Sequence, residues 1–536
     1  VQVRHLNAEE TLGAVDLILT DKTGTLTDNR LAVRGVRTPA GEVIGSDRRR
    51  SLLLDALRAE DDAWRLADGA RPNSFTRALL AALAESGVAG LPSGDVLVEA
   101  EPASDTQPFS RAVFAGGVDG GGRRELALGA AEALVAVADG DAWLGLVAGG
   151  AAAGERLVVL AERAADRAPE RDAPWTPRAV IAFADPLREG IREAVVAVRE
   201  AGIQVLVVTG DHPGTAAAIA REAGIEADTI VTGQELDGWD DAEVAARLAG
   251  LDIVARATPA QKMRLVMAAR ADGRTIAVTG DGVNDAPALH AADVAVAMGS
   301  GTAVAKGASD LVLGDDSFAS LTYALREGRR IVANVQKGLV FLISTHVAML
   351  GFLLIATLAG YDRPLVPLQI LWLELFIDLS TSIAFEREPE EPGAMRRPPR
   401  PRGRPLLTDV LLTKVSVAGS FSAIAALVLL ATHGGGLEHA TWLAYTALVI
   451  GQAVRAYANR SLTTPVWRLP FNGFLLAACV TVIVIQVALP IVPAVATAFH
   501  ATPLDLLDWT LVAVVALVPA AVAQVLRAVT GREWVG

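Results

Sequence analysis

The sequence predicts a chain of two parts: a doubly wound, parallel α/β sheet followed by a bundle of membrane-spanning helices. Apolar, β-branched runs that end in Gly/Asp turns alternate with amphipathic stretches in the first part. From about residue 331 onward the chain becomes strongly apolar, and its mean hydropathy is +0.38 over the whole length. A net charge of -13 and the lack of a basic face exclude a nucleic-acid partner.

Four apolar runs are expected to be parallel strands, and they cover residues 17–20, 205–209, 275–279 and 294–297. Helical patterns such as 188–201 and 214–223 lie between them. Ligands of such sheets bind at the carboxyl ends of the strands. We therefore expect Asp21, Asp211 and Asp281, each of which follows a strand, to converge at one edge.

Residues 21–27 (Asp-Lys-Thr-Gly-Thr-Leu-Thr) form the most informative segment. A carboxylate at the end of a buried strand, followed by a turn with hydroxyls and free N–H groups, is suited to bind phosphate. Asp21 then acts as a nucleophile that becomes an aspartyl phosphate. The alternative is an ordinary solvated turn after a strand, and the full heptapeptide favours the functional interpretation.

This heptapeptide resembles the phosphorylation signature of the P-type cation-transporting ATPases, and later segments extend the resemblance over nearly the whole chain. The resemblance implies an α/β haloacid-dehalogenase-like, Rossmann-like phosphorylation domain with an inserted α+β nucleotide-binding domain, followed by an all-α bundle of six transmembrane helices. The expected boundaries are 1–30 and 177–330 for the phosphorylation domain, 31–176 for a degenerate nucleotide-binding domain, and 331–536 for the transmembrane domain.

The resemblance also assigns roles around the nucleophile. Asp281, in the segment Gly-Asp-Gly-Val-Asn-Asp, would hold Mg²⁺ together with Asp21 and the backbone carbonyl of Thr23, since phosphoryl transfer needs a hard cation with oxygen ligands. Lys262 matches the family lysine that touches the phosphoryl oxygens, although an isolated lysine on a helix is usually a surface residue. The remaining candidates are the phosphate-loop residues Thr209, Gly210 and Asp211, the loop-orienting Asn284 and Asp285, and Arg188 at the hinge of the inserted domain.

The residue two places after the nucleophile separates pumps from phosphatases of the same fold. Such phosphatases usually carry an Asp there as general acid and base, whereas this chain has Thr23. A hydroxyl cannot take that role near neutral pH, so the aspartyl phosphate should persist, as a pump requires.

ATP is the expected nucleotide, although the nucleotide-binding domain matches the family only in part. Phe109 and Arg111 belong to a segment that resembles the one whose Phe stacks on adenine, with an ordinary core aromatic as the alternative for Phe109. Leu128 replaces a nucleotide-contacting lysine, and a carboxylate expected near Thr76 is absent. We therefore predict measurable but weak nucleotide affinity.

Six apolar stretches in the last part are long enough, with their flanks, to cross a bilayer. They cover residues 339–358, 366–385, 410–432, 442–456, 474–493 and 511–526. The connection 386–405 is rich in arginine, while 433–440 and 492–507 contain no Lys or Arg. The apolar stretches predict an integral, multi-pass membrane protein, and the composition indicates a prokaryotic plasma membrane. The positive-inside rule predicts that both termini are cytoplasmic. The single cysteine, Cys479, excludes an intramolecular disulfide and a Cys-x-x-Cys metal site, and it is expected to be a packing residue.

Polar residues within the apolar stretches are candidates for an ion path. Glu374 and Asp378 are four residues apart and share one helical face, and intramembrane carboxylates usually serve an ion path or pair with a neighbour. His346 and Gln452 occupy places where related pumps carry cation ligands, although an intramembrane His is more often an interhelical hydrogen-bonder. Because Met349 replaces a carboxylate of the calcium pumps, the transported cation is expected to be one divalent ion or protons.

Family pumps carry an actuator domain and four more spans before the phosphorylation site, and neither occurs in this sequence. We expect the chain to be a carboxyl-terminal portion of a pump whose partner is the missing amino-terminal half. Two alternatives remain: a membrane-anchored phosphatase of the same fold, and a non-catalytic partner of a full pump.

Overall fold

The structure is a computed structural model that describes the chain except residues 6, 69–70, 89, 93, 105–106, 116–122, 136–139, 153, 165–173, 375–378, 435, 533–534 and 536. The described chain divides into two compact units. The first comprises residues 1–8 and 15–323, and the second comprises residues 9–14 and 324–536. Each unit has its own hydrophobic core.

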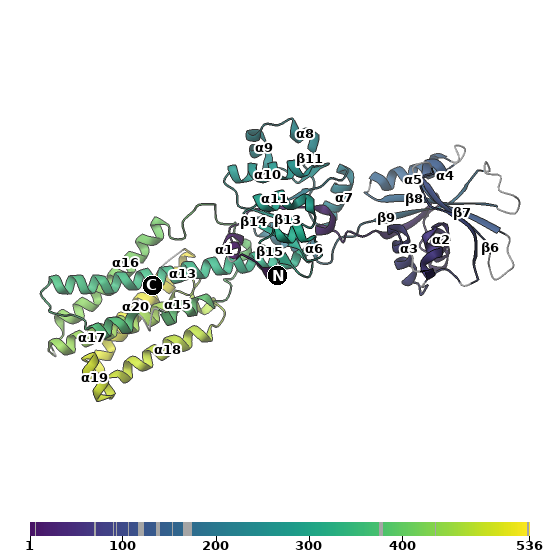
Figure 1. The fold of residues 1–536 in the computed structure, drawn as a ribbon. Coiled ribbons are helices and arrows are strands. Elements are labelled where there is room, and N and C mark those ends of the chain that lie inside the picture. Colours follow the sequence, from purple (N-terminus) through teal and green to yellow (C-terminus); the bar gives the residue numbers. More distant parts are fainter. Residues whose placement is uncertain are drawn as a thin grey trace. The chain divides into compact units, whose positions relative to one another are not determined.

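An eight-stranded sheet forms the centre of the first unit and confirms the predicted doubly wound fold (Figure 1). All its strand pairs are parallel except the edge pair β1–β15. The strands in spatial order are β1 (Gln2–Val3), β15 (Leu311–Leu313), β14 (Val294–Met298), β13 (Ile276–Gly280), β2 (Leu17–Thr20), β10 (Gln204–Val208), β12 (Ile253–Ala255) and β11 (Ile230–Thr232).

Helices cover this sheet and connect its strands. They are α6 (Ile191–Glu200), α7 (Pro213–Glu222), α8 (Gly233–Asp237), α9 (Asp241–Leu248), α10 (Pro259–Ala271), α11 (Ala286–Ala291) and α12 (Ala303–Gly307). Strand β2 is fully buried between β13 and β10, which explains its uninterrupted apolar sequence. The residue that follows β2 therefore emerges at the middle of the carboxyl edge of the sheet.

A second, seven-stranded antiparallel sheet is inserted between β2 and β10. Its spatial order is β4 (Gly41–Glu42), β3 (Ala32–Thr38), β9 (Thr176–Ala184), β8 (Arg156–Ala164), β7 (Arg123–Gly129), β6 (Phe109–Ala115) and β5 (Val96–Glu101). Figure 1 shows α2 (Ser46–Ala59) and α3 (Ser74–Ala84) on one face, with α4 (Ala131–Leu134) and α5 (Gly140–Ala152) on the other.

The expected domain boundary between residues 176 and 177 falls inside this second sheet. Strand β9 pairs with both β3 and β8, because its apolar residues 179–183 are buried between the two cores of the inserted domain. The chain leaves the first domain after Thr27 and returns to it before Leu187, and these two residues form an isolated β-bridge. Beside the bridge, Thr27 Oγ1 donates a hydrogen bond to the Asp185 carboxylate. The inserted segment thus extends to about Ala184.

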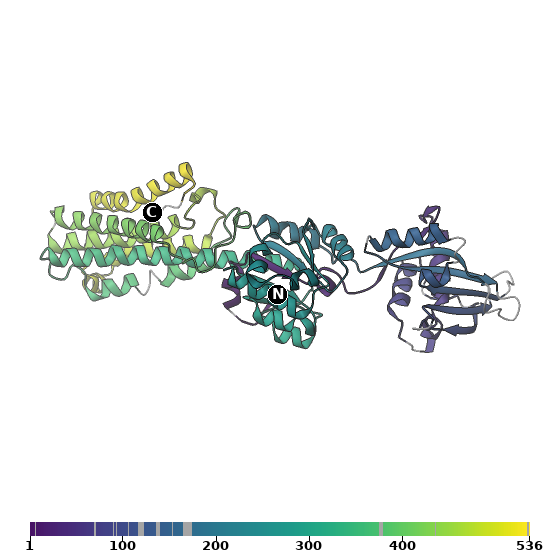
Figure 2. The same ribbon diagram turned by 90° about the horizontal axis from the view of Figure 1, so that it is seen from above.

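The second unit is a helical bundle whose longest helices lie side by side (Figure 2). Its helices are α13 (Phe318–Leu358), α14 (Pro367–Leu371), α15 (Leu379–Glu386), α16 (Asp409–Thr432), α17 (Leu437–Ala458), α18 (Gly473–Ala488), α19 (Pro493–Phe499) and α20 (Leu506–Thr530), and the short helix α1 (Asn7–Leu12) begins in the first unit and ends in this one. Helix α17 is largely buried and packs against α16, α18 and α20.

Four helices in the described part of the chain are long and apolar enough to cross a membrane, namely α13, α16, α18 with its 3₁₀ extension to Ile491, and α20. The other two predicted stretches are different. Residues 442–456 lie in α17, a long helix that carries Glu438, Gln452 and Arg455, and 366–385 contains the short helices α14 and α15. The count of six spans therefore stays a prediction.

Candidate active site

Asp21 begins a tight turn at the carboxyl end of β2. Its Oδ1 accepts a hydrogen bond of 2.7 Å from the backbone N–H of Lys22. Gly24 has a φ of +75°, and a Cβ added there would lie 1.9 Å from Oδ2 of Asp281. Only glycine lets the backbone of this turn approach the Asp281 carboxylate, which follows the neighbouring strand β13.

Lys262 reaches Asp21 from the amino-terminal part of α10. The helix begins at Pro259 after Thr258, which forms a capping box with Gln261. The Nζ atom of Lys262 lies 2.7 Å from Asp21 Oδ2 and 2.9 Å from Asp285 Oδ1. The lysine is 6% exposed, so it is not the surface residue that its helix position alone suggests.

One buried ammonium thus faces the carboxylates of Asp21, Asp281 and Asp285. Burial, together with the neighbouring Asp285, raises the pKa of Asp21 even though Lys262 opposes the shift. Burial and the carboxylates of Asp285 and Asp21 likewise raise the pKa of Asp281. Burial alone would lower the pKa of Lys262, but the two carboxylates that it contacts hold the pKa above its ordinary value.

The charges of this cluster fit a magnesium ion. Three carboxylates and one ammonium leave an uncompensated charge of about -2, which is what a divalent cation neutralises. Asp21 and Asp281 offer hard oxygen ligands beside the turn that contains Thr23. These two carboxylates and the carbonyl of Thr23 would hold the ion.

The second loop expected at the site lies beside the same turn. The Asp211 carboxylate forms an ion pair with Lys22, and the backbone N–H of Asp211 donates to Thr209 Oγ1 at 3.2 Å. Gly210 lies between them in the loop after β10. The buried Thr209 and the exposed Gly210 therefore lie at the carboxyl edge of the sheet, although Lys22 rather than Asp21 is the partner of Asp211.

Arg188 and Asn284 differ in how they relate to the cluster. Arg188 donates to the backbone carbonyl of Gly24 at 2.8 Å, so it contacts the turn that follows Asp21. Asn284 is exposed in the 3₁₀ turn that follows β13, and within the described chain its side chain makes no hydrogen bond to the cluster. Asp285, one residue later, is buried, and its Oδ2 accepts the N–H of Gly282.

A cavity of about 410 Å³ opens in the inserted domain. Three of its lining residues carry chemistry that the sequence analysis missed. The guanidinium of Arg156 lies 4.9 Å from the ring centre of Phe75. The Glu60 carboxylate accepts hydrogen bonds from Asn73 (2.7 Å) and Ser110 (2.9 Å), and burial raises its pKa. Residues 60, 75 and 156 form no recognisable motif in the sequence. They come together only because α2 and α3 pack on the sheet that contains β8.

Phe109 and Arg111 do not line this cavity. They alternate along β6 with Ser110, which does, and so they lie on the opposite face of the sheet. The Phe109 ring packs edge-on against Trp175 with centroids 5.7 Å apart. The Arg111 guanidinium forms ion pairs with Glu99, Glu101 and Glu125, and the hydrogen bonds that it donates to Glu101 raise its pKa most.

Comparison with protein families assigns both parts of the chain. The family described as haloacid dehalogenase-like hydrolase matches residues 15–293, more than half of the chain. The family described as "Cation transporting ATPase, C-terminus" matches residues 362–529. The chain belongs to the P-type cation-transporting ATPases.

Curated relatives agree with this assignment to the P-type ATPases. The chain is 33% identical to the probable cation-transporting ATPase F of Mycobacterium tuberculosis over 96% of its own length and 63% of the relative. It is 34% identical to calcium-transporting ATPase 1 of Bacillus cereus over 65% of its length and 42% of the relative. The calcium-transporting ATPase of Bacillus subtilis is 34% identical over 62% of the chain and 38% of the relative. The chain thus spans less than two thirds of the length of these P-type ATPases.

In the helical unit of this P-type ATPase, the structure brings two of the four expected ion residues together. His346 on α13 places Nε2 3.1 Å from Glu374 Oε2, and its Nδ1 lies 2.8 Å from the carbonyl of Leu342. Because a carbonyl only accepts, Nδ1 of His346 is the atom that can donate in its contact with Leu342. Asp378 lies outside the described residues.

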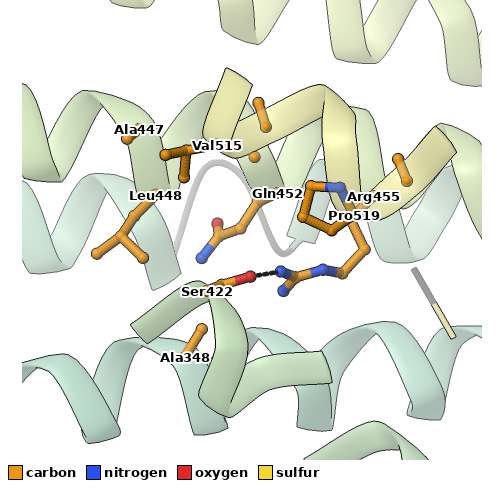
Figure 3. A pocket seen from close by; sticks show the side chains of 11 residues that line it. Ala348, Ser422, Ala447, Leu448, Gln452, Arg455, Val515 and Pro519 are labelled. Carbon is orange, nitrogen blue, oxygen red and sulfur yellow. Dashed lines mark hydrogen bonds between the residues drawn. The ribbon is translucent and has the colours of Figure 1, made fainter. Parts of the chain in front are cut away.

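Gln452 lies in a different place, at a small cavity among α13, α16, α17 and α20 (Figure 3). Arg455 lines the same cavity and donates to Ser422 Oγ. Within the described chain, neither polar atom of the Gln452 side chain has a hydrogen-bond partner. The cavity therefore has polar groups free to bind a small polar guest, next to a buried cation.

Proposed function

We propose that this P-type ATPase performs ATP-driven cation transport across a membrane through an aspartyl phosphate on Asp21, as part of a longer pump. The observation that carries the proposal is the buried cluster in which Lys262 lies 2.7 Å from Asp21, with Asp281 beside the same turn. Asp21 attacks the γ-phosphorus of ATP in line, the bond to the departing ADP oxygen breaks, and Lys262 offsets charge on the phosphoryl oxygens. Asp21, Asp281 and the carbonyl of Thr23 would hold Mg²⁺, which would offset negative charge on the phosphoryl oxygens.

The phosphoenzyme itself is the test of this proposal. Purified full-length chain is incubated with labelled ATP and Mg²⁺, quenched in acid and treated with hydroxylamine. We expect an acid-stable, hydroxylamine-labile label that is lost in Asp21→Asn and kept in Asp272→Asn, a matched control at an exposed carboxylate of the same domain. A parallel reaction with labelled inorganic phosphate removes the dependence on nucleotide affinity. Absence of label from both donors would support the non-catalytic partner instead.

The persistence of the phosphoenzyme separates a pump from a phosphatase. Thr23 offers no carboxylate to activate water, so we expect hydrolysis of p-nitrophenyl phosphate to be slow. Thr23→Asp should accelerate loss of the label by about 10²-fold or more, the usual contribution of a general base. Rapid turnover by the unaltered chain would favour the membrane-anchored phosphatase.

ATP is proposed to bind in the cavity of the inserted domain, where Arg156 and Phe75 present a cation and a ring and Glu60 presents a carboxylate for an amino group. Arg156→Ala should weaken the binding of a fluorescent ATP analogue by about tenfold or more, the cost of a charge-assisted hydrogen bond. Leu128→Lys, at the buried cavity wall, should strengthen it. Phe109→Ala and Phe75→Ala distinguish the two faces of the sheet. If Phe109→Ala weakens binding of the ATP analogue as much as Phe75→Ala does, adenine binds on the face that carries Phe109 instead.

The cation path is proposed to include Glu374 and His346, with Asp378 and Gln452 as further polar groups. Both termini are proposed to be cytoplasmic, since the arginine-rich connection 386–405 marks the inner side. Binding of radioactive Ca²⁺ or Mn²⁺ to the purified chain should weaken in Glu374→Gln. Unchanged binding of both ions, together with unchanged proton release during phosphorylation, would remove Glu374 from the path.

A further inference from the structure

We propose that His433, His439 and Asp508 form a binding site for a divalent transition-metal ion of the zinc type, apart from the candidate ion path of Glu374 and His346. The site lies at the end of the bundle where α16 ends and where α17 and α20 begin (Figure 1). One ligand atom from each of the three residues lies within 4.8 Å of the other two.

The spacing of these atoms suits a small metal ion. Nε2 of His433 lies 3.3 Å from Asp508 Oδ1, and Nε2 of His439 lies 3.1 Å from Asp508 Oδ2. Ligands about 2.0–2.1 Å from a tetrahedral zinc ion are about 3.3 Å apart. Each imidazole nitrogen is already at about this distance from one of the two oxygens of the Asp508 carboxylate. The two imidazole rings are part-exposed and have centroids 5.1 Å apart, so they can rotate until both nitrogens face one ion held by that carboxylate.

Asp508 is an unusual group at this position because its side chain is 1% exposed. Its Oδ2 accepts the backbone N–H of Asp505 at 2.8 Å, as part of the cap of α20. Within the described chain, Oδ1 accepts no hydrogen bond. A buried carboxylate oxygen without a donor costs free energy, and a cation bound between the two imidazoles would compensate it.

The surroundings of the site also fit a metal ligand set. Nδ1 of His439 lies 2.9 Å from Thr502 Oγ1, so this nitrogen can donate its proton to the hydroxyl and leave Nε2 free to bind metal. The two segments that carry the ligands or flank them, 433–440 and 492–507, contain no Lys or Arg. Glu438 and Asp505 add negative charge, so nothing in these segments repels a cation.

The donor set selects the class of ion. Two imidazole nitrogens and one carboxylate suit Zn²⁺, Co²⁺, Ni²⁺ or Cu²⁺, whereas Ca²⁺ and Mg²⁺ prefer sites made of oxygen ligands alone. A bound ion would tie α16, α17 and α20 together at one end of the bundle. Its first effect is therefore on the stability of the helical unit.

The test uses Co²⁺ and Zn²⁺ on the purified full-length chain in detergent. Bound Co²⁺ should give a visible absorption band at one equivalent, and Zn²⁺ should remove that band by displacement. His433→Gln and His439→Gln should each weaken binding by about tenfold or more. His500→Gln is the matched control, because His500 lies near the same end of the bundle but pairs with Glu438 instead. His346→Gln controls for metal at the candidate ion path.

Folding is monitored separately by thermal unfolding in a chelator, because Asp508 also caps α20 and its replacement can destabilise the helix. The glutamine variants should unfold at about the same temperature as the unaltered chain in chelator but lose the stabilisation by Zn²⁺. A Co²⁺ band that survives in both variants, a band lost in His346→Gln, or no saturable binding by the unaltered chain would each overturn the proposal.

Discussion

At the level of single residues, the chemistry of the first unit depends on one lysine among three carboxylates. Lys262 contacts Asp21 and Asp285, and Asp281 lies against Gly24. The cluster forms because strands β2 and β13 are neighbours and end at the same edge, while α10 brings its second turn to that edge. Without a bound cation this arrangement is electrostatically unfavourable, which gives it a distinct dependence on pH.

The stability of the first unit without metal should fall as the pH rises. Asp21 and Asp281 have raised pKa values in the folded chain, so the folded state binds more protons than the unfolded state between the ordinary pKa near 3.8 and the raised values. The free energy of unfolding therefore decreases across that range. Mg²⁺ should reverse the loss at neutral pH. Thermal unfolding between pH 4 and 8, with and without Mg²⁺, measures both effects.

Asp281→Asn is the variant for this prediction. Removing one of three mutually repelling carboxylates should make the metal-free unit more stable at neutral pH while reducing the stabilisation by Mg²⁺, with at least about a tenfold loss of affinity. Asp272→Asn, at an exposed position, should change neither quantity. A variant that is less stable without metal and keeps its response to Mg²⁺ would contradict the assignment.

Gly24→Ala should disrupt the turn that follows Asp21. The added Cβ would meet Asp281 Oδ2 at 1.9 Å, and the φ of +75° is strained for any L side chain. We expect a loss of at least about 2 kcal/mol in the stability of the first unit, together with loss of Mg²⁺ binding. Gly273→Ala separates the two causes, because its φ is +77° but its Cβ meets open space. Equal effects from both variants would show that only backbone strain is important.

At the level of elements, the helical unit is held by close helix contacts and by buried polar groups. Helix α17 contributes more buried side chains to the bundle core than any other described helix, including Trp442 and Tyr445. Helices α13 and α16 approach each other closely at Gly419, where an added Cβ would lie 2.6 Å from the carbonyl of Ser344. Small residues allow this kind of contact in membranes, where the lipid supplies no hydrophobic drive for helix association.

Gly419→Val should separate α13 from α16. Backbone atoms of α13 cannot move aside as a flexible side chain can, so we expect a destabilisation of about 1–3 kcal/mol, seen as a lower unfolding temperature of the helical unit in detergent. Gly338→Ala on α13 is the control, since nothing lies within 4 Å of its added Cβ and helix propensity favours alanine. An unchanged unfolding temperature in Gly419→Val would show that the two helices do not pack closely in the membrane.

At the level of the whole molecule, two units with separate cores carry two kinds of chemistry. The carboxylate cluster and the inserted domain belong to the first unit, and the membrane helices with His346 and Glu374 belong to the second. Coupling phosphorylation to ion movement needs a conformational change that both units share. The chain spans less than two thirds of its curated relatives, so the coupled cycle is a property to be tested on the longer protein.

Calorimetry of the full chain in detergent should resolve two unfolding transitions. Separate hydrophobic cores unfold independently unless a large interface joins them. Mg²⁺ should raise only the transition of the first unit, and Asp281→Asn should remove that shift. If His433, His439 and Asp508 bind zinc as proposed, Zn²⁺ should raise only the unfolding temperature of the helical unit. A single transition that responds to both ions would show instead that the two units unfold together.

The sequence by itself determined the fold class, the family and the residues at the ends of the buried strands. Asp21, Asp211 and Asp281 each follow an apolar strand, and parallel strands must bring such residues to one edge. Local rules of this kind act over a few residues and can be recognised without coordinates. The same rules gave the arginine-rich and arginine-free connections of the apolar part.

Only the tertiary structure decided the partners of these residues. The cavity formed by Glu60, Phe75 and Arg156 joins positions up to 96 residues apart in the chain, counted from residue numbers. The position of Phe109 against Trp175 and the approach of His433 and His439 to Asp508 likewise depend on contacts between distant segments. The tertiary structure also decided which charged residues pair with one another. Arg111, for example, forms ion pairs with three glutamates. Sheet register and helix packing set such contacts, because they depend on the summed burial of many side chains rather than on any local pattern.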